Sequence, residues 1–168
     1  AREVLPHFDT DMAKRLRQSL GKRGIVIETQ AAVKSVAKIN SSLAVNYEKK
    51  GKTLAVEADV VLMAVGRKAN VSSLNLDDVG IDYTQRGITV DDNMLTSVPH
   101  VYAVGDVNGR QMLAHAAEMQ GKRAVNHILG EADGICFDIM PAAIFTNPEA
   151  ACVGKTEDQL KADGTEYI

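Results

Sequence analysis

Residues 96–127 read TSVPHVYAVGDVNGRQMLAHAAEMQGKRAVNH, and this stretch decides the fold. The apolar run 101–104 is typical of a strand covered on both faces, and it ends at Gly105 and Asp106. After a short polar loop, a helix is predicted to begin at Leu113. Open α/β sheets bind their ligands at the carboxyl ends of their strands. The stretch therefore predicts an α/β fold with a ligand site beside Asp106.

The predicted helix offers backbone groups to a ligand. Its first turn is small and apolar and lacks the Ser, Thr, Asp or Asn that usually caps a helix. Backbone N–H groups at the positive end of the helix dipole would then be available to a ligand oxygen. Asp106 is a candidate to hold a hydroxyl group, and the spacing fits a plain loop-capping aspartate equally well. We expect an ion pair between Glu118 and Lys122, and an apolar side made of Leu113, Ala117, Gly121, Val125 and Ile128.

The composition is that of an ordinary globular chain. The 168 residues are 45% hydrophobic and 24% charged, with a net charge of −3. This charge gives no reason to expect nucleic acid or an anionic membrane surface as a partner. No apolar run approaches the length of a membrane span, and the first residues lack a signal-peptide pattern. We therefore expect a cytoplasmic protein without nucleic-acid or membrane partners.

The two cysteines, Cys136 and Cys152, are too far apart in the sequence for a redox CxxC pair or a zinc site. Both stand among apolar residues, so we expect small buried thiols in a reducing compartment. No metal site is predicted.

The rest of the chain carries local signals for helices, strands and turns. A helix is predicted to start near Asp9 and end near Lys22, with Gly24 as its stop. Paired strands are expected on both sides of a turn at residues 49–52. Thr156 opens a helix in the style of a capping box. Two further buried strands are predicted at residues 25–27 and 59–65, short strands at 80–83 and 87–91, and a helix end at Gly164.

Four motifs together resemble one known family. They are LPHFD at residues 5–9, VGR at 65–67, TSVPHVYAVGDV at 96–107 followed by MLAHAAEMQG at 112–121, and TNPEAACVG at 146–154. In this order they resemble the middle of the polypeptide of the pyridine nucleotide–disulfide oxidoreductases, with the best match among the dihydrolipoamide dehydrogenases. In the family the second motif continues as VGRxPN, and this sequence has Ala69 at the position of the proline.

The resemblance implies roles for particular residues. Asp106 is expected to bind the ribityl chain of FAD. The start of the helix is expected to stabilise the negative charge that a reduced flavin carries near N1 and O2. Gln120, where many relatives have Glu, is expected on the solvent side. The implied backbone contacts are Met112, Leu113, Ala114 and His115 with the flavin ring, and Gly66 and Ala31 with a bound dinucleotide.

The resemblance also implies an architecture, which is a fragment of a Rossmann-like flavoprotein with two dinucleotide-binding domains. Residues 1–66 correspond to the end of the NAD-binding domain and 67–134 to the end of the FAD-binding domain. Residues 135–168 correspond to the start of an α+β dimerisation domain. A homodimer is implied, with the lipoyl domain of a 2-oxo acid dehydrogenase or glycine cleavage complex as a candidate partner.

The expected reaction passes electrons between dihydrolipoamide, FAD and NAD. The chain contains no G-x-G-x-x-G, and it lacks the family's redox-active cysteine pair and the C-terminal His-Glu pair. His7, His100, His115 and His127 fit none of these roles, so no catalytic residue is predicted and the chain alone is expected to be inactive. The alternatives are glutathione reductase, mercuric reductase, an NADH oxidase, or a non-catalytic nucleotide-binding or dimerisation module.

Overall fold

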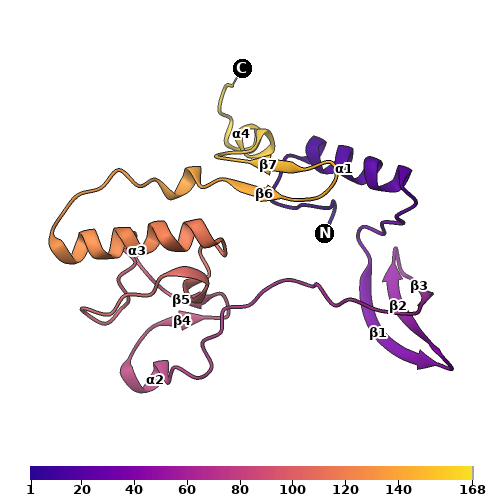
Figure 1. The fold of residues 1–168 in the computed structure, drawn as a ribbon, viewed down its shortest axis with the longest axis horizontal. Helices are drawn as coiled ribbons and strands as arrows, with labels where there is room; N and C mark the ends of the chain where they lie inside the picture. The colour runs from indigo at the N-terminus through magenta and orange to yellow at the C-terminus, as the bar shows by residue number, and fades with distance from the viewer. Residues whose placement is uncertain (168) are drawn as a thin grey trace. The chain divides into compact units, whose positions relative to one another are not determined.

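The computed structural model describes residues 1–167, which form two compact units of mixed helices and strands (Figure 1). Unit 1 combines residues 1–64 with the chain from Pro141 onwards, and unit 2 is Val65–Met140. The expected α/β class is confirmed. The helices are α1 (Thr10–Lys22), α2 (Leu76–Val79), α3 (Ala114–Leu129) and α4 (Glu157–Asp163), with the 3-10 turns η1 (Gly105–Asn108) and η2 (Phe137–Ile139). The strands are β1 (Ala32–Ile39), β2 (Ser42–Lys49), β3 (Lys52–Ala58), β4 (Tyr83–Thr84), β5 (Gly87–Ile88), β6 (Ala142–Ile144) and β7 (Ala150–Cys152).

The largest sheet of unit 1 is antiparallel in the order β1-β2-β3. Val45 of β2 pairs with Val36 on one side and Val56 on the other. Between β2 and β3, Lys50 and Gly51 both have positive φ angles, of 50° and 72°. Two such residues in succession form the turn whose twist matches that of a hairpin. The predicted pair of strands around residues 49–52 is confirmed.

Helices α1 and α4 of unit 1 cap each other. The backbone N–H and the hydroxyl of Thr10 donate to Asp158 Oδ2 at 3.1 and 2.5 Å. In return, the backbone N–H of Glu157 donates to Asp9 Oδ1 at 2.6 Å. The hydrogen bonds from Thr10 also lower the pKa of Asp158. The first residues of each helix therefore donate to a carboxylate from the other segment. These bonds satisfy backbone N–H groups that have no partner within their own helix.

This exchange of caps predicts a measurable loss of stability. Replacing Asp9 by alanine removes the acceptor at the start of α4, and we expect a cost of about 1 kcal/mol in the free energy of unfolding, measured with urea. Asp11→Ala is the matched control, because Asp11 is largely exposed and its nearest cation, Lys14, is 3.8 Å away. That control is expected to change stability by only a few tenths of a kcal/mol. Equal effects of the two substitutions would contradict the exchange.

Helix α4 has the ends that the sequence predicts. The Thr156 hydroxyl accepts from the Gln159 N–H, and the Gln159 side chain accepts from the Thr156 N–H, so the capping box is confirmed. Gly164 ends the helix with a left-handed φ of 66°. Helix α1 likewise ends as predicted, at Lys22. Because these capping interactions join residues within one helix turn of each other, they can be predicted from the sequence alone.

Unit 2 has its own small apolar core. Leu76 of α2 and Ile88 of β5 lie in it together with Ile81 and Ala103. Val71, Val90, Val98 and Val107 pack against these residues. Helix α3 and the β4–β5 hairpin both contact η1. The turn at Gly105–Asn108 is therefore the centre of this unit.

The predicted buried strands at residues 25–27 and 59–65 are wrong. Val26 is 84% exposed, and the run from Val60 to Val65 belongs to an exposed connecting segment in which Leu62 is 87% exposed. A buried parallel strand needs hydrogen-bonding neighbours on both edges and cover on both faces. Within residues 1–167 all strand pairs are antiparallel, so these apolar runs have no such neighbours.

The predicted strand at residues 101–104 is also wrong in its main feature. It forms a single antiparallel bridge, between Tyr102 and Leu95. Ala103 is buried, whereas Val101 and Val104 are exposed. Only Ala103 of this run is fully buried, so the run is not a strand covered on both faces.

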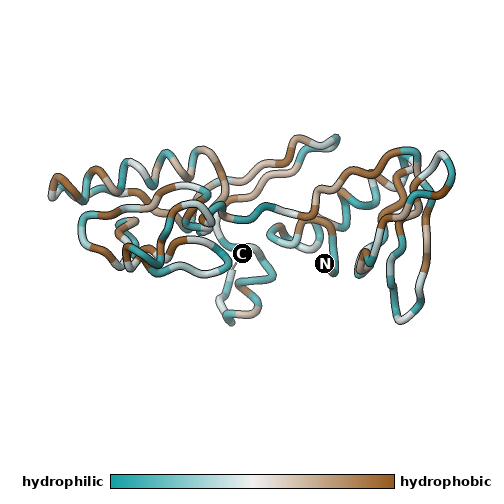
Figure 2. Tube along the Cα trace, turned by 90° about the horizontal axis from the view of Figure 1, so that it is seen from below, coloured by the Kyte–Doolittle hydropathy of each residue, from teal (hydrophilic) through white to brown (hydrophobic). Residues whose placement is uncertain are grey.

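The buried face of α3 differs from the expected one. Ala116, Gln120 and Ala124 are buried, whereas Val125 and Ile128 of the predicted apolar side are exposed. Hydrophobic and hydrophilic residues alternate along the turns of this helix (Figure 2). The small side chains of the alanines allow α3 to pack closely on η1. Alanine is less hydrophobic than Val or Ile, so a prediction from hydrophobic spacing favours the face that carries Val125 and Ile128. The predicted ion pair between Glu118 and Lys122 is confirmed at 3.0 Å.

The cysteines are more accessible than expected. Cys136 is exposed and Cys152 is half-buried, so the prediction of buried thiols is wrong. None of the helices within residues 1–167 has the length and apolarity needed to cross a membrane.

Candidate functional site

The candidate site is built on the turn η1, which presents Asp106. Gly105 has a φ of 81°, a value that favours glycine. A Cβ atom at this position would lie 3.3 Å from the Cβ of Ala117, so glycine also allows the close approach of α3. The turn closes with a hydrogen bond from the Gly109 N–H to the Asp106 carbonyl at 3.1 Å. The sequence Gly105-Asp106 thus places the carboxylate on a tight corner.

Backbone packing against the β4–β5 hairpin supports the same turn from the other side. A Cβ atom on Gly109 would lie 1.9 Å from the Arg86 carbonyl oxygen, and one on Gly87 would lie 2.4 Å from the Val107 carbonyl oxygen. Only glycine permits backbones to approach this closely. The side chain of Val107 packs against the core of the unit. The residues that flank Asp106 are therefore held in place.

A buried amide pair joins the turn to α3. Gln120 Oε1 accepts from the Gly105 N–H at 2.7 Å and from Asn108 Nδ2 at 2.8 Å. Asn108 Nδ2 also donates to the Ala103 carbonyl at 2.9 Å. Gln120 is 1% exposed, so the expectation that it lies on the solvent side is wrong. Its hydrogen bonds to the Gly105 backbone and to the Asn108 side chain cannot be predicted from helical spacing alone.

Asp106 itself points outward and meets Arg67. The Arg67 guanidinium lies 2.9 Å from Asp106 Oδ2, and both side chains are substantially exposed. Arg67 follows Gly66, whose φ of 122° is again favourable for glycine. The structure thereby brings the VGR motif and the Asp106 motif together. Sequence reasoning missed Arg67 as a site residue, and its place directly after Gly66 was the available signal.

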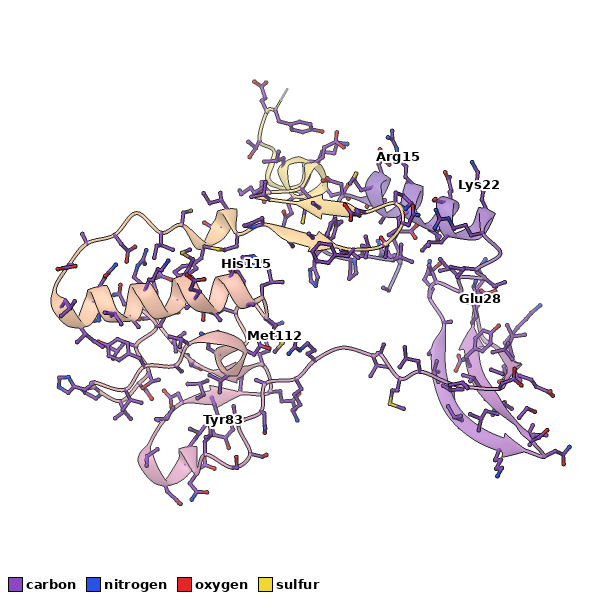
Figure 3. All side chains as sticks on the ribbon, in the orientation of Figure 1. Arg15, Lys22, Glu28, Tyr83, Met112 and His115 are labelled. Carbon is purple, nitrogen blue, oxygen red and sulfur yellow. The ribbon has the colours of Figure 1, made fainter. Side chains whose placement is uncertain are left out.

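Helix α3 begins beside this turn. Leu113 is its N-cap residue, with extended backbone angles and no side-chain oxygen to accept from the first helical N–H groups. The first intrahelical hydrogen bond runs from the Ala117 N–H to the Leu113 carbonyl at 3.0 Å. Met112 lies just before the helix and His115 in its first turn (Figure 3). The predicted helix start is confirmed, and its positive dipole end carries no acidic cap from its own sequence.

A second set of contacts fixes the segment before α3. Gln111 Nε2 donates to the Phe137 carbonyl at 2.9 Å. The guanidinium of Arg123 lies over the Phe137 ring, 5.4 Å from its centre. Arg123 Nε donates to both carboxylate oxygens of Asp133 at 2.9 Å, and its NH2 group donates to the Ile135 carbonyl at 2.6 Å. These contacts hold the residues after α3 against the helix and against Gln111.

The ion pair within this set shifts the ionisation of both partners. Hydrogen bonding to Arg123 holds the pKa of Asp133 well below its usual range, and the Ile135 N–H and the Asn126 amide lower it further. The same pairing raises the pKa of Arg123. Both side chains are largely buried, at 18% and 9% exposure. The pair is therefore charged throughout the neutral range.

The structure brings most of the predicted site residues into unit 2. These are Gly66, Asp106, Met112, Leu113, Ala114 and His115. Ala31 lies in unit 1, where it lines an apolar pocket with Val33, Val45 and Tyr47. Within residues 1–167, no group of three His, Cys, Asp or Glu side chains is arranged to hold a metal ion.

The donors and acceptors of the unit 2 site suit a flavin. Asp106 offers an exposed carboxylate on a fixed turn, which can accept from a hydroxyl group. The start of α3 offers a positive dipole end without a capping side chain of its own. These are the groups that a polyol chain and an electron-rich ring edge require.

Comparisons with known proteins identify the family of this chain. The sequence profile described as "Pyridine nucleotide-disulphide oxidoreductase" matches residues 1–121. A dihydrolipoyl dehydrogenase of Geobacillus stearothermophilus is 38% identical over 100% of this chain and 36% of its own length. A leghemoglobin reductase of Glycine max is 38% identical over 99% of this chain and 32% of its own length.

A solved structure shows the same fold. The crystal structure of LpdA from Mycobacterium tuberculosis aligns with a TM-score of 0.82 and 35% identity, covering 94% of this chain and 34% of that protein. The chain thus spans about a third of the length of the relatives it matches. The matched profile covers most of the chain, including VGR and the Asp106 turn. The chain belongs to the pyridine nucleotide–disulphide oxidoreductase family.

Proposed function

We propose that this chain supplies the cofactor-contacting middle part of a dihydrolipoamide dehydrogenase-like flavoenzyme, which uses FAD and NAD. The observation that carries the proposal is the Asp106 turn, held between Gln120 of α3 and the β4–β5 hairpin. The relatives named above, which include a dihydrolipoyl dehydrogenase, support the choice of substrate. The active protein would be a homodimer, with a lipoyl domain of a 2-oxo acid dehydrogenase or glycine cleavage complex as its partner.

Three domains share the chain in this proposal. Residues 1–66 end an NAD-binding domain, residues 67–134 end an FAD-binding domain, and residues 135–168 begin a dimerisation domain. Asp106 accepts a hydrogen bond from a ribityl hydroxyl of FAD. Gly66 lets the backbone approach the dinucleotide closely, and Ala31 supplies a second backbone contact. The flavin ring meets the backbone of Met112, Leu113, Ala114 and His115.

The chain's own residues orient and stabilise, and they do not react. FAD, when bound, supplies two-electron transfer between a dithiol and NAD. The N-terminus of α3 stabilises negative charge without a mobile cation, because its dipole is fixed by the helix. Arg67 adds a positive charge beside Asp106. Reactive cysteines and an acid–base pair would come from the two thirds of the relatives' length that this chain does not span.

A chimera tests the proposal. The matching segment of the Geobacillus stearothermophilus enzyme is replaced by residues 1–168, and the purified protein is assayed for flavin content and for NAD reduction by dihydrolipoamide. We expect a flavin-containing dimer that reduces NAD with dihydrolipoamide. A folded dimer that carries no flavin would overturn the proposal.

In the same chimera, Asp106→Ala is expected to weaken FAD binding by about 10- to 100-fold, because a hydrogen bond to a charged group is lost. The dissociation constant is measured from flavin fluorescence after removal and return of FAD. Asp92→Ala is the matched control, since Asp92 is an exposed acid that also pairs with an arginine, Arg110 at 2.9 Å. Equal losses for the two variants would remove Asp106 from the site.

A further inference from the structure

Gln120 is a buried polar residue on an otherwise small apolar face. It lies between Ala116 and Ala124 on the buried face of α3, and its side chain is almost completely enclosed. A buried amide is costly unless it forms hydrogen bonds. Its oxygen forms two, and both lead to η1, the turn that carries Asp106.

The orientation of both amides follows from their backbone partners. The Gly105 N–H can only donate, so the atom of Gln120 that faces it must be the oxygen. Asn108 must then present its nitrogen to Gln120 Oε1 and to the Ala103 carbonyl. This leaves Asn108 Oδ1 to accept from the Arg110 N–H at 3.0 Å. Only one arrangement of the two amides satisfies all four contacts.

We propose that Gln120 is a positioning residue, which fixes the direction of Asp106 relative to the start of α3. It binds one end of η1 directly at Gly105 and the other end through Asn108. Because Gln120 belongs to α3, the carboxylate and the helix N-terminus share one rigid support. The inference rests on the proposed function, in which both groups contact one flavin.

The choice of an amide has a chemical reason. A carboxylate at position 120 could accept the same two hydrogen bonds, and it would also place a second negative charge close to Asp106. Such a buried acid would bind a proton more readily, so the position of the turn would depend on pH. The neutral amide keeps the same geometry at every physiological pH.

Hydrogen exchange of the chain without flavin tests the positioning. The backbone amides are followed by NMR in the 168-residue chain and in Gln120→Met, which keeps the side-chain length but removes the acceptor. We expect the Gly105 amide to exchange at least about tenfold faster, whereas the Ala103 amide, which donates to the Met94 carbonyl at 3.0 Å, keeps its protection. Glu118→Gln, an exposed change on the same helix, is the control.

Gln120→Glu separates positioning from a general loss of packing. At pH 8 this variant is expected to restore the protection of Gly105, and the protection is expected to vary between pH 8 and pH 5. Unchanged Gly105 exchange in Gln120→Met would overturn the inference, as would a failure of Gln120→Glu to restore it.

Flavin affinity gives the second readout. In the chimera, Gln120→Met is expected to weaken FAD binding about tenfold although Asp106 is intact, and unchanged affinity would overturn the positioning role. The proposed function fails separately, if the chimera with the unaltered segment binds no FAD.

Discussion

Replacing Gly109 by alanine is expected to lower the free energy of unfolding by at least about 3 kcal/mol. The new Cβ atom would lie 1.9 Å from the Arg86 carbonyl oxygen and 2.8 Å from the carbonyl carbon. Both of these are backbone atoms at the turn of the β4–β5 hairpin, so no side-chain rotation can relieve the overlap. The hairpin and η1 must separate, and the loss is measured by urea unfolding.

Two other glycines separate the overlap from the backbone strain. Gly130 has a φ of 73°, close to the 65° of Gly109, but a Cβ atom there would meet nothing within 4 Å. Gly130→Ala should therefore cost only about 1 kcal/mol, the strain of a left-handed residue. Gly121 lies inside α3 in equally open space, so Gly121→Ala should stabilise by up to about 1 kcal/mol. If Gly109→Ala and Gly130→Ala lower the free energy of unfolding equally, the hairpin backbone does not contact η1 as closely as described.

The same substitution should also disturb the site. Gly109 donates to the Asp106 carbonyl, and Val107 between them packs on the core. Moving Gly109 away from Arg86 must therefore move Asp106. In the chimera, Gly109→Ala is expected to lose flavin even under conditions in which the protein stays folded.

Local signals in the sequence predicted the helices and turns well. The ends of α1 and α4, the capping box at Thr156 and the turn at Lys50-Gly51 all depend on atoms within a few residues of each other. The start of α3 at Leu113 is of the same kind. Such features follow from backbone chemistry that does not depend on the rest of the fold.

The predicted buried strands failed for a physical reason. An apolar run such as 59–65 satisfies its backbone only through neighbouring strands, and the sequence of the run does not contain those neighbours. In residues 1–167 this run lies exposed. Val125 and Ile128 of α3 are exposed for the same reason: their side chains are hydrophobic, but no other segment within residues 1–167 covers them.

The candidate site was predictable in part. Asp106 and the start of α3 stand in one continuous stretch, so their pattern could be read directly. Gln120, Asn108 and Arg67 act through contacts with residues that are not their helical or strand neighbours. Spacing rules assign such residues to faces of an element and do not assign them to partners. Spacing alone therefore does not show that the amide of Gln120 is buried.

Arg123→Ala is expected to lower the free energy of unfolding by about 2–3 kcal/mol. The change removes the bonds to Asp133 and to the Ile135 carbonyl, together with the contact on the Phe137 ring. Asp133 would remain largely enclosed without its cation. Arg123→Lys should recover little of the loss, because an ammonium cannot reproduce the forked geometry of a guanidinium.

Arg110→Ala is the matched control. Arg110 binds Asp92 Oδ1 at 2.9 Å and the Asp91 carbonyl at 2.8 Å, but its acidic partner is 87% exposed. An exposed pair of this kind contributes at most about 1 kcal/mol. If the two arginine variants lose the same stability, burial is not what makes the Arg123 pair important.

The pH dependence gives this pair a signature that a packing defect lacks. The pKa of Asp133 is lowered in the folded chain, so its contribution is fully present above the unfolded carboxyl pKa of about 3.9 and is lost as the pH falls through the folded value. The difference in stability between the original chain and Arg123→Ala should therefore be constant from pH 8 to pH 5 and should shrink by pH 3. Urea unfolding at these pH values measures it. A difference that stays the same at pH 3 would mean that Arg123 acts through its contacts with Phe137 and Ile135, without the charge of Asp133.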